Sequence, residues 1–422
     1  MGATIGGDLD CTGGEFSKSS GDDALSADGV QVKGDTLLRN DFKAEGAVRL
    51  LGATIGGNLD CTSGKFSGSA GYALSADGVQ IKGNAFLDSG FNAQGEVSLS
   101  GATIDGTLKC DGAQFSNPQR REGEDRRALR ADLVEIKGAA VLDGFKADGV
   151  VYFVGATIAD LQIRRVLEPE KTILDLRSTD VRTFCDDERS WPKAGNLLLD
   201  GFRYQRIDAQ SPLDAKRRNE WLHRQPSGRF LPETYEQLAT TLRSMGHEHD
   251  ARLVMIQKNR DQVPSTRFLG QRWWWYAFFG RAIGYGYAPW RAFVGSVLMI
   301  LLGWLLFDFG GSHGLFSPAK DSAYEKNSSG QFVQVTEGRK LADDYPVFNA
   351  LVYSLESFTP LLKLDQSANW IPNASSSVHC RLWRWPVTVT GSELRWYLWI
   401  HIIIGWVLTT LWVGAVTGLV KS

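Results

Sequence analysis

Apolar and polar residues alternate in short pieces through the first 160 positions, and many of these pieces end at a glycine. Val30–Gly34 and Val79–Gly83 both read apolar, polar, apolar, polar, glycine. Alternation over so few residues is typical of short β-strands that bury one face and are separated by corners. The pattern therefore predicts a succession of short strands in this part of the chain.

These pieces belong to an internal repeat. Two blocks that begin at Ala24 and Phe42 each return twice, and the block Gly2–Cys11 returns at Gly52–Cys61 and at Gly101–Cys110. The interval is 50 and then 49 residues. Three blocks in each interval predict that one coil holds about 16 residues.

Such a coil cannot bury its own apolar face, so the coils must stack on one another. We therefore expect a β-helix or a related β-solenoid over residues 1–206. A glycine-rich flexible linker is the alternative, but a linker would not keep apolar residues in register over three units. Because Met1–Ala3 enters in the middle of a unit without a capping element, we expect a truncated start or a partner that covers this end.

Three of the five cysteines, Cys11, Cys61 and Cys110, hold the same position in successive units. Three coils would separate them by about 14 Å, which exceeds the limit of about 7 Å between the Cα atoms of a disulfide. We expect them to be small buried residues of the solenoid. Cys185 and Cys380 stand alone, so no metal site is expected from the cysteines.

A polar linker over 207–230 leads to a predicted helical hairpin over 231–262. Pro232 opens its first helix, and Gly246 marks the turn before the second. The hairpin either couples the solenoid to the rest of the chain or is only a spacer. The aromatic stretch that follows, 268–286, predicts an interfacial helix on a membrane surface.

Two apolar segments, 287–307 and 396–420, are long enough to cross a membrane. The second has no Asp, Glu, Lys or Arg. A buried core helix is the alternative, but tryptophans next to both segments favour membrane spans within a module over 287–422. His401 is expected at the outer interface. The expected interfacial anchors are Trp273, Trp274, Trp275, Trp290, Trp396 and Trp399.

Between the spans, the segment 346–364 is too short to cross. Val347–Phe358 predicts about three helical turns, and Pro360 makes the following residues extended. A half-helix followed by extended backbone indicates a re-entrant loop that lines a pore; the alternative is an amphipathic helix on the outer surface. The candidate pore-lining residues are Glu356, Ser357, Thr359, Lys363 and Asp365.

Two glycines four residues apart, Gly414 and Gly418, indicate close helix packing in the second span. Together with the half-span they predict a homo-oligomer, with a tetramer favoured. Composition adds little, because a net charge of −2 gives no reason to expect binding to nucleic acid.

Basic residues predict the orientation. Six Lys or Arg lie between Lys258 and Arg291 against one acid, whereas charges in the loop 310–345 balance. No signal peptide is recognisable at the start. We therefore expect a bacterial cytoplasmic membrane protein with its solenoid in the cytoplasm.

Several motifs resemble a known bacterial family. They are the Gly-Ala-Thr-Ile repeats, Tyr235–Leu238, Gly284–Trp290 and Tyr353–Leu361. The chain is similar to proteins that join a bactofilin-like or pentapeptide-like solenoid to two membrane spans. Members carry labels such as ion-channel-like membrane protein or membrane-associated oxidoreductase. The resemblance implies a mixed fold, with a β-solenoid, a helical hairpin and a two-helix membrane module, and no residue-level mechanism.

Three functions follow as hypotheses. The first is a cation-conducting pore gated through the solenoid, and the second is a membrane-anchored scaffold or sensor whose solenoid binds a protein. The third is an oxidoreductase, and only the family label supports it. The sequence has no dinucleotide-binding glycine motif, no Cys-x-x-Cys motif and no haem or iron–sulfur spacing. No catalytic residue or cofactor is expected. The expected partners are membrane lipid, copies of the chain and a protein on the solenoid.

Overall fold

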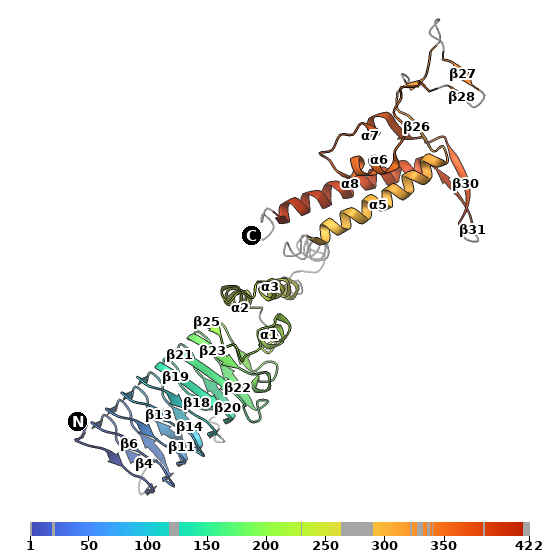
Figure 1. Cartoon of the computed structure of the whole chain (residues 1–422). Helices are drawn as coiled ribbons and strands as arrows, with labels where there is room; N and C mark the ends of the chain where they lie inside the picture. Colours follow the sequence, from blue (N-terminus) through green and yellow to red (C-terminus); the bar gives the residue numbers. More distant parts are fainter. Residues whose placement is uncertain are drawn as a thin grey trace. The chain divides into compact units, whose positions relative to one another are not determined.

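The computed structural model divides into two compact units, Met1–Ser265 and Thr266–Ser422 (Figure 1). The first contains the strands of a solenoid and three helices, and the second contains the two longest helices. The structure describes residues 2–18, 22–117, 126–228, 230–262, 290–320, 323–326, 332–335, 338–339, 341–382 and 385–416.

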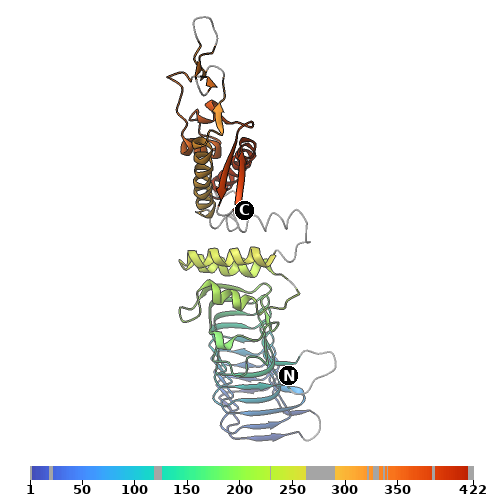
Figure 2. The same cartoon turned by 90° about the vertical axis from the view of Figure 1, so that its right-hand side faces the viewer.

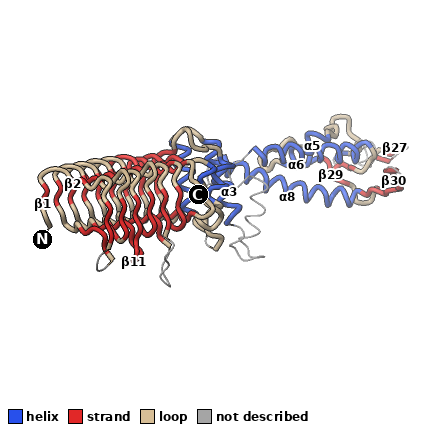
Figure 3. Tube along the Cα trace, turned by 90° about the horizontal axis from the view of Figure 1, so that it is seen from below, coloured by secondary structure: helices blue, strands red, loops and turns tan. Residues whose placement is uncertain are grey.

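Residues 4–207 form a β-solenoid, as predicted, in which two parallel sheets wind along the same axis (Figure 3). The strands of the first sheet are β1 (Thr4–Ile5), β2 (Leu9–Asp10), β5 (Gln31–Val32), β6 (Thr36–Leu37), β9 (Thr54–Ile55), β10 (Leu59–Asp60), β12 (Gln80–Ile81), β13 (Ala85–Phe86), β15 (Thr103–Ile104), β16 (Leu108–Lys109), β19 (Glu135–Asp143), β21 (Thr157–Arg164), β23 (Asp180–Asp186) and β25 (Arg203–Ile207).

The second sheet faces another side of the coil. Its strands are β3 (Glu15–Ser17), β4 (Asp23–Ser26), β7 (Lys43–Glu45), β8 (Ala47–Arg49), β11 (Lys65–Ser75), β14 (Asn92–Ser98), β17 (Gln114–Ser116), β18 (Arg127–Arg130), β20 (Lys146–Tyr152), β22 (Thr172–Asp175) and β24 (Leu197–Leu198). A short 3₁₀-helix, η1 (Glu188–Ser190), interrupts a corner near the end.

The length of one turn corrects the sequence prediction. Thr4, Gln31, Thr54, Gln80 and Thr103 are successive partners in one ladder, so the steps are 27, 23, 26 and 23 residues. The prediction of 16 residues is wrong because one turn contains several short strands, and a sequence block is not a whole turn. Each 50-residue unit contains two turns.

Side-chain size explains why the sequence repeats only every second turn. One inward column alternates between large and small residues, Phe16, Ala44, Phe66, Ala93 and Phe115. Phe42 and Phe91 fill the space that the alanines leave. The five rings form a stack with centroids 5.1 to 5.7 Å apart. Alternating large and small residues let successive layers interdigitate at native packing density.

The cysteines obey the same two-turn rule. The amides of Cys11, Leu38 and Cys61 each donate a hydrogen bond to a carbonyl on the next turn. The turn between the two cysteines therefore has a leucine at the same position. Cys11 and Cys61 are therefore two turns apart, about 9.6 Å rather than 14 Å. The distance still excludes a disulfide. Cys61 and Cys110 are fully buried, as predicted, whereas Cys11, on the first turn, is only half-buried.

Three helices cover the C-terminal end of the solenoid within the first unit (Figure 2). They are α1 (Ala215–Leu222), α2 (Pro232–Ser244) and α3 (Glu248–Gln262). The predicted hairpin is confirmed as α2 and α3, with Pro232 in the first turn and Gly246 at φ +87° after α2. Helix α1 lies inside the predicted polar linker. Gln237 and Thr241 of α2 both donate to the carbonyl of Tyr204 in the last strand of the first sheet.

The second unit is built around two long apolar helices. Helix α5 (Trp290–Ser312) and helix α8 (Gly391–Val416) pack against the short helix α6 (Ala350–Phe358). Helix α7 (Gln366–Asn369) follows α6. The strands are β26 (Phe316–Pro318), β27 (Gln334–Val335), β28 (Gly338–Arg339), β29 (Trp370–Pro372), β30 (Ser377–Leu382) and β31 (Trp385–Thr390), paired as β26 with β29, β27 with β28 and β30 with β31.

Both predicted spans correspond to helices that are long and apolar enough to cross a membrane. Helix α5 continues five residues beyond the predicted end at Phe307. Helix α8 begins five residues before the predicted start at Trp396, so its first turn contains Glu393. The predicted interfacial segment 268–286 lies outside the described residues.

Candidate functional sites

The half-helix predicted between the spans is present as α6. The side chain of Asn349 accepts a hydrogen bond from the Val352 amide and caps the N-terminus. The helix ends at Thr359, whose φ of −100° and ψ of 108° are extended, because a residue before proline avoids the helical region. The local pattern thus predicts the end of α6 correctly, whereas the helix begins at Ala350, three residues after the predicted start at Val347.

Two glycines allow α6 to pack closely against both long helices. A Cβ on Gly303 of α5 would lie 2.4 Å from Ser354 Oγ, and a Cβ on Gly405 of α8 would lie 2.0 Å from the Phe358 carbonyl oxygen. Real Cβ atoms do not approach other atoms so closely, so a larger residue would displace the side chains of Ser354 and His401 at position 303 and the backbone of α6 at position 405. These glycines fix the place of α6 between α5 and α8.

A buried polar network joins the same three helices. Ser354 Oγ donates to the Ile300 carbonyl at 2.8 Å. His401 Nε2 lies 3.2 Å from the Ser354 carbonyl oxygen, and its Nδ1 lies 3.3 Å from the Tyr397 hydroxyl. With its proton on Nε2, the imidazole donates to Ser354 and accepts from Tyr397, so a neutral ring is satisfied on both sides.

The environment of His401 differs from the sequence prediction. The side chain is completely buried, with the rings of Phe307, Phe358 and Tyr397 at centroid distances of 5.7, 5.3 and 5.5 Å. The expectation of an interfacial histidine is wrong, because α6 covers this face of α8. His401 is a packing residue that connects helices from three parts of the sequence.

Glu356, the main pore-lining candidate, forms hydrogen bonds with residues of the same chain. Its Oε2 accepts hydrogen bonds from the amides of Gln366 and Ser367 at 2.8 and 3.0 Å, and its Oε1 accepts one from Ser367 Oγ at 3.0 Å. The carboxylate therefore ties the loop after α6 back to the helix. The residues that hold this loop were not recognisable from the sequence, because α7 has no helical periodicity of its own.

The other predicted residues lie in varied environments. Ser357 is half-buried, and its hydroxyl has no hydrogen-bond partner among the described residues. Thr359 is half-buried, whereas Lys363 and Asp365 are exposed. Asp365 has a left-handed φ of +61° immediately before α7. The structure therefore brings only Glu356 and the α7 loop together, and the five candidates do not converge on one point within the subunit.

The predicted anchors and packing glycines are described only in part. Trp290, Trp396 and Trp399 are exposed on the two long helices, and their role as interfacial anchors stays a prediction. The rings of Trp396 and Trp399 are 4.9 Å apart and nearly perpendicular. Gly414 belongs to α8. Trp273, Trp274, Trp275 and Gly418 lie outside the described residues.

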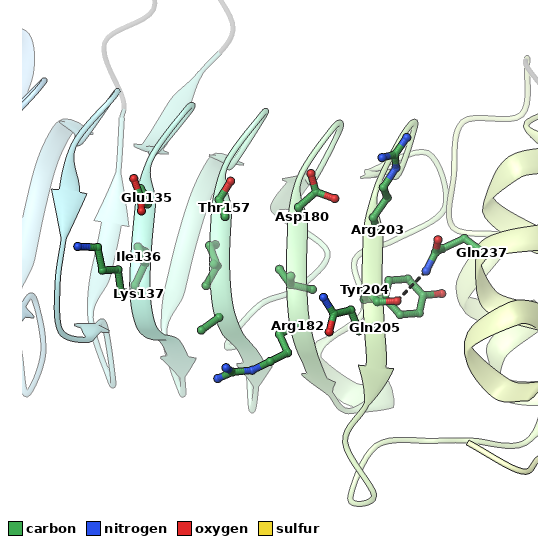
Figure 4. Close-up of a pocket in the computed structure, with 13 residues that line it drawn as sticks. Glu135, Ile136, Lys137, Thr157, Asp180, Arg182, Arg203, Tyr204, Gln205 and Gln237 are labelled. Atoms are coloured by element: carbon green, nitrogen blue, oxygen red, sulfur yellow. Dashed lines mark hydrogen bonds between the residues drawn. The ribbon is translucent and has the colours of Figure 1, made fainter. Parts of the chain in front are cut away.

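A second candidate site is a groove on the first sheet of the solenoid, with a volume of about 610 Å³ (Figure 4). It crosses four turns, from β19 through β21 and β23 to β25, and α2 closes one end with Gln237. Its floor includes Thr157 and Ala159 of β21. Sequence reasoning did not find this groove, because its residues are dispersed over 135–237 and only the strand register aligns them.

Charged side chains surround the floor in two columns. Glu135, Thr157 and Asp180 are aligned in register on neighbouring turns, and Lys137, Ala159 and Arg182 lie two positions further along the same strands. The first column thus carries the carboxylates of Glu135 and Asp180 and continues to Arg203 on the last turn, whereas the second carries Lys137 and Arg182 (Figure 4).

Only some of these charges are paired inside the protein. Lys137 Nζ lies 2.7 Å from Asp105 Oδ1, and this hydrogen bond raises the pKa of Lys137 and lowers that of Asp105. Arg182 contacts Asp160 at 3.3 Å. No ion pair within the described part of the chain involves Glu135 or Asp180. The groove therefore offers the carboxylates of Glu135 and Asp180, with Arg203 next to Asp180, along one side, and two cations that each have one partner along the other.

Neither site shows the features of a metal or cofactor centre. In the parts of the chain that the structure describes, no group of three or more His, Cys, Asp or Glu side chains is arranged to hold a metal ion. Comparison of the chain with protein-family models, with curated proteins and with solved structures finds no match.

Proposed function

We propose that this protein is a membrane-anchored binding protein, in which α5 and α8 hold the chain in a bilayer and the solenoid groove binds a protein partner. The observation that carries the proposal is the groove itself. It lies on stacked parallel strands, whose hydrogen bonds join every turn to the next, so its charged side chains are held at fixed spacings. A preorganised surface of this kind favours binding, because little conformational freedom is lost.

The arrangement of the membrane unit supports anchoring more than conduction. Glu356 is already bound to the α7 loop, and the polar groups of Ser354 and His401 satisfy one another. Side chains that line an ion path need free oxygen atoms that can replace the hydration shell of an ion. The polar groups of α6 instead stabilise the packing of three helices within one subunit.

Site-specific photo-crosslinking in intact cells tests this function. A photoreactive residue replaces Thr157 in the groove, and a control variant carries it at Gln94, which is exposed on the second sheet. We expect a discrete adduct from position 157 that position 94 does not give, and we expect its loss in Asp180→Lys. Equal labelling at both positions, or no adduct at either, would contradict a groove-specific partner.

A cation-conducting oligomer is the second candidate function. Half-helix α6 and the extended residues after it support it, since non-helical backbone at membrane depth normally faces protein or a water-filled path. In this case several copies would surround an axis near the exposed Leu361–Leu364 segment. Ion flux into liposomes that contain the purified full chain tests the proposal, and the absence of flux above empty liposomes would refute it.

The proposal also includes the side of the membrane on which the solenoid lies and the family to which the chain is similar. The excess of basic residues between Lys258 and Arg291 supports a cytoplasmic solenoid in a bacterial inner membrane. The motifs similar to the two-span solenoid family support the same arrangement. An oxidoreductase activity has no support from side-chain chemistry in either site.

A further inference from the structure

We propose that the groove binds an extended peptide segment in which a basic and an acidic side chain are two residues apart. This inference rests on the proposed function of the groove and adds the chemical class of the partner. The acidic column would bind the basic side chain, and the basic column would bind the acidic one. The spacing of the columns, the small side chains between them and an internal precedent for the bound carboxylate support it.

The strand register defines a trough over β21. Glu135 and Lys137 of β19 form one wall, and Asp180 and Arg182 of β23 form the other. The walls are two turns apart, about 9.6 Å, which is the width that one extended chain needs. The floor between them carries the small side chains of Thr157 and Ala159.

Charge spacing along the trough matches that of an extended peptide. Glu135 and Lys137 are two residues apart on one strand, and so are Asp180 and Arg182. This separation is about 6.6 Å, and residues i and i+2 of a bound strand have the same separation and face the same side. A Lys-x-Glu segment therefore places each charge opposite two charges of the other sign.

The neighbouring trough contains its own carboxylate. There, Asp105 lies between Lys82 and Lys137, at 3.3 and 2.7 Å from their Nζ atoms. Asp105 directly follows Ile104, and Ala159 directly follows Ile158, the residue two turns further on in the same ladder. Asp105 places a carboxylate between two cations. Ala159 has no carboxylate, so the corresponding space between Lys137 and Arg182 is free for a carboxylate of the ligand.

Two contacts within the protein compete on the basic side of the trough. Lys137 Nζ lies 2.7 Å from Asp105. Arg182 has one nitrogen 3.3 Å from Asp160, and the Arg182 side chain is largely accessible to solvent. A guanidinium has five N–H donors, so this contact leaves donors for a ligand carboxylate. On the acidic side, Glu135 and Asp180 have no ion-pair partner in the described ranges, and Arg203, the ladder neighbour of Asp180, lies on the turn outside the trough.

Fluorescence anisotropy with the full chain in lipid nanodiscs tests the inference. The probe is labelled Ac-Thr-Lys-Thr-Glu-Thr-NH2, and the matched control is Ac-Thr-Thr-Lys-Glu-Thr-NH2. The control has the same composition, but its adjacent charges face opposite sides of an extended strand. We expect at least tenfold tighter binding of the first peptide. Equal binding of both, or no binding of either at millimolar concentration, would overturn the inference.

Two variants at one position test the internal precedent. Ala159→Asp places a carboxylate where Asp105 lies in the neighbouring trough, so it should weaken peptide binding at least tenfold. Ala159→Asn has nearly the same size without the charge, and it should bind within threefold of the unchanged protein. Lys33→Ala, on the same face but outside the trough, is a further control. Unchanged binding in Ala159→Asp would overturn the inference.

The outcomes separate this inference from the proposed function. A groove-specific adduct at position 157 without discrimination between the peptides retains the binding function and overturns only the proposed ligand class. Without an adduct at position 157, the binding function itself fails.

Discussion

Replacement of Arg218 by methionine should loosen the cap of the solenoid. The Arg218 and Asp186 side chains are 0% and 2% exposed, and the guanidinium donates to both carboxylate oxygens at 2.7 and 3.0 Å. Its Nε also donates to the Pro212 carbonyl at 2.6 Å, and Trp191 Nε1 donates to Asp186 at 2.8 Å. These bonds fasten α1 to the end of β23.

The magnitude follows from the burial of the pair. Arg218→Met leaves the Asp186 carboxylate buried without its cation, a change that costs about 3–5 kcal/mol. Since about 1.4 kcal/mol corresponds to a tenfold change in an equilibrium constant, α1 should open from a hundred to a few thousand times more often. Amide hydrogen exchange on the full chain in detergent micelles measures this opening in α1 and β23.

The adjacent Arg217 provides a matched control. It is about half exposed and pairs with Glu188 and Asp214 at the surface, so Arg217→Met should have little effect. The double variant Asp186→Leu, Arg218→Met removes both charges and should recover much of the protection. If the amides of α1 exchange at equal rates in the Arg217→Met and Arg218→Met variants, the buried ion pair does not hold the cap.

Three further results are expected. Gly405→Ala should destabilise the second unit by about 1–3 kcal/mol, because its Cβ meets the Phe358 carbonyl oxygen, whereas the Cβ of Gly295→Ala would make only an ordinary contact with Leu408 at 4.0 Å. Equal melting temperatures of the two variants in micelles would contradict this. Burial raises the pKa of the Cys61 and Cys110 thiols. Stability should therefore be constant below the unfolded pKa of about 8.5 and fall above it. A free energy of opening in the solenoid, obtained from exchange rates corrected for the base-catalysed intrinsic rate, that stays unchanged from pH 8 to pH 10 would refute this. Glu356→Gln should speed exchange of the Gln366 and Ser367 amides while α6 stays protected, and an unaltered rate would show that the carboxylate does not hold this loop.

Local patterns predicted the elements that depend on neighbouring residues. Strand pieces such as Gln31–Val32, the start of α2 at Pro232 and the end of α6 before Pro360 all follow from nearby residue types. The length of one turn could not be obtained in this way. Phenylalanine and alanine alternate on successive turns, so the sequence period reports two turns, and only strand pairing shows where one turn closes.

Contacts between distant segments explain what the sequence did not predict. His401 has aromatic neighbours in sequence that suggest an interface, but its actual partner is Ser354, 47 residues away. The charges of the groove are similarly far apart in sequence and meet only through the register of β19, β21 and β23. Such pairings depend on packing between elements, which hydrophobic periodicity does not encode.

The most direct measurement is a density map of the full chain in lipid nanodiscs. We expect α5 and α8 to cross the bilayer, α6 to enter it without crossing, and the solenoid to lie in water with its groove open to solvent. A map in which α5 and α8 lie outside the bilayer, buried in contacts between copies of the chain, would contradict membrane anchoring. Without an anchor, the proposed function of the protein would have to be abandoned.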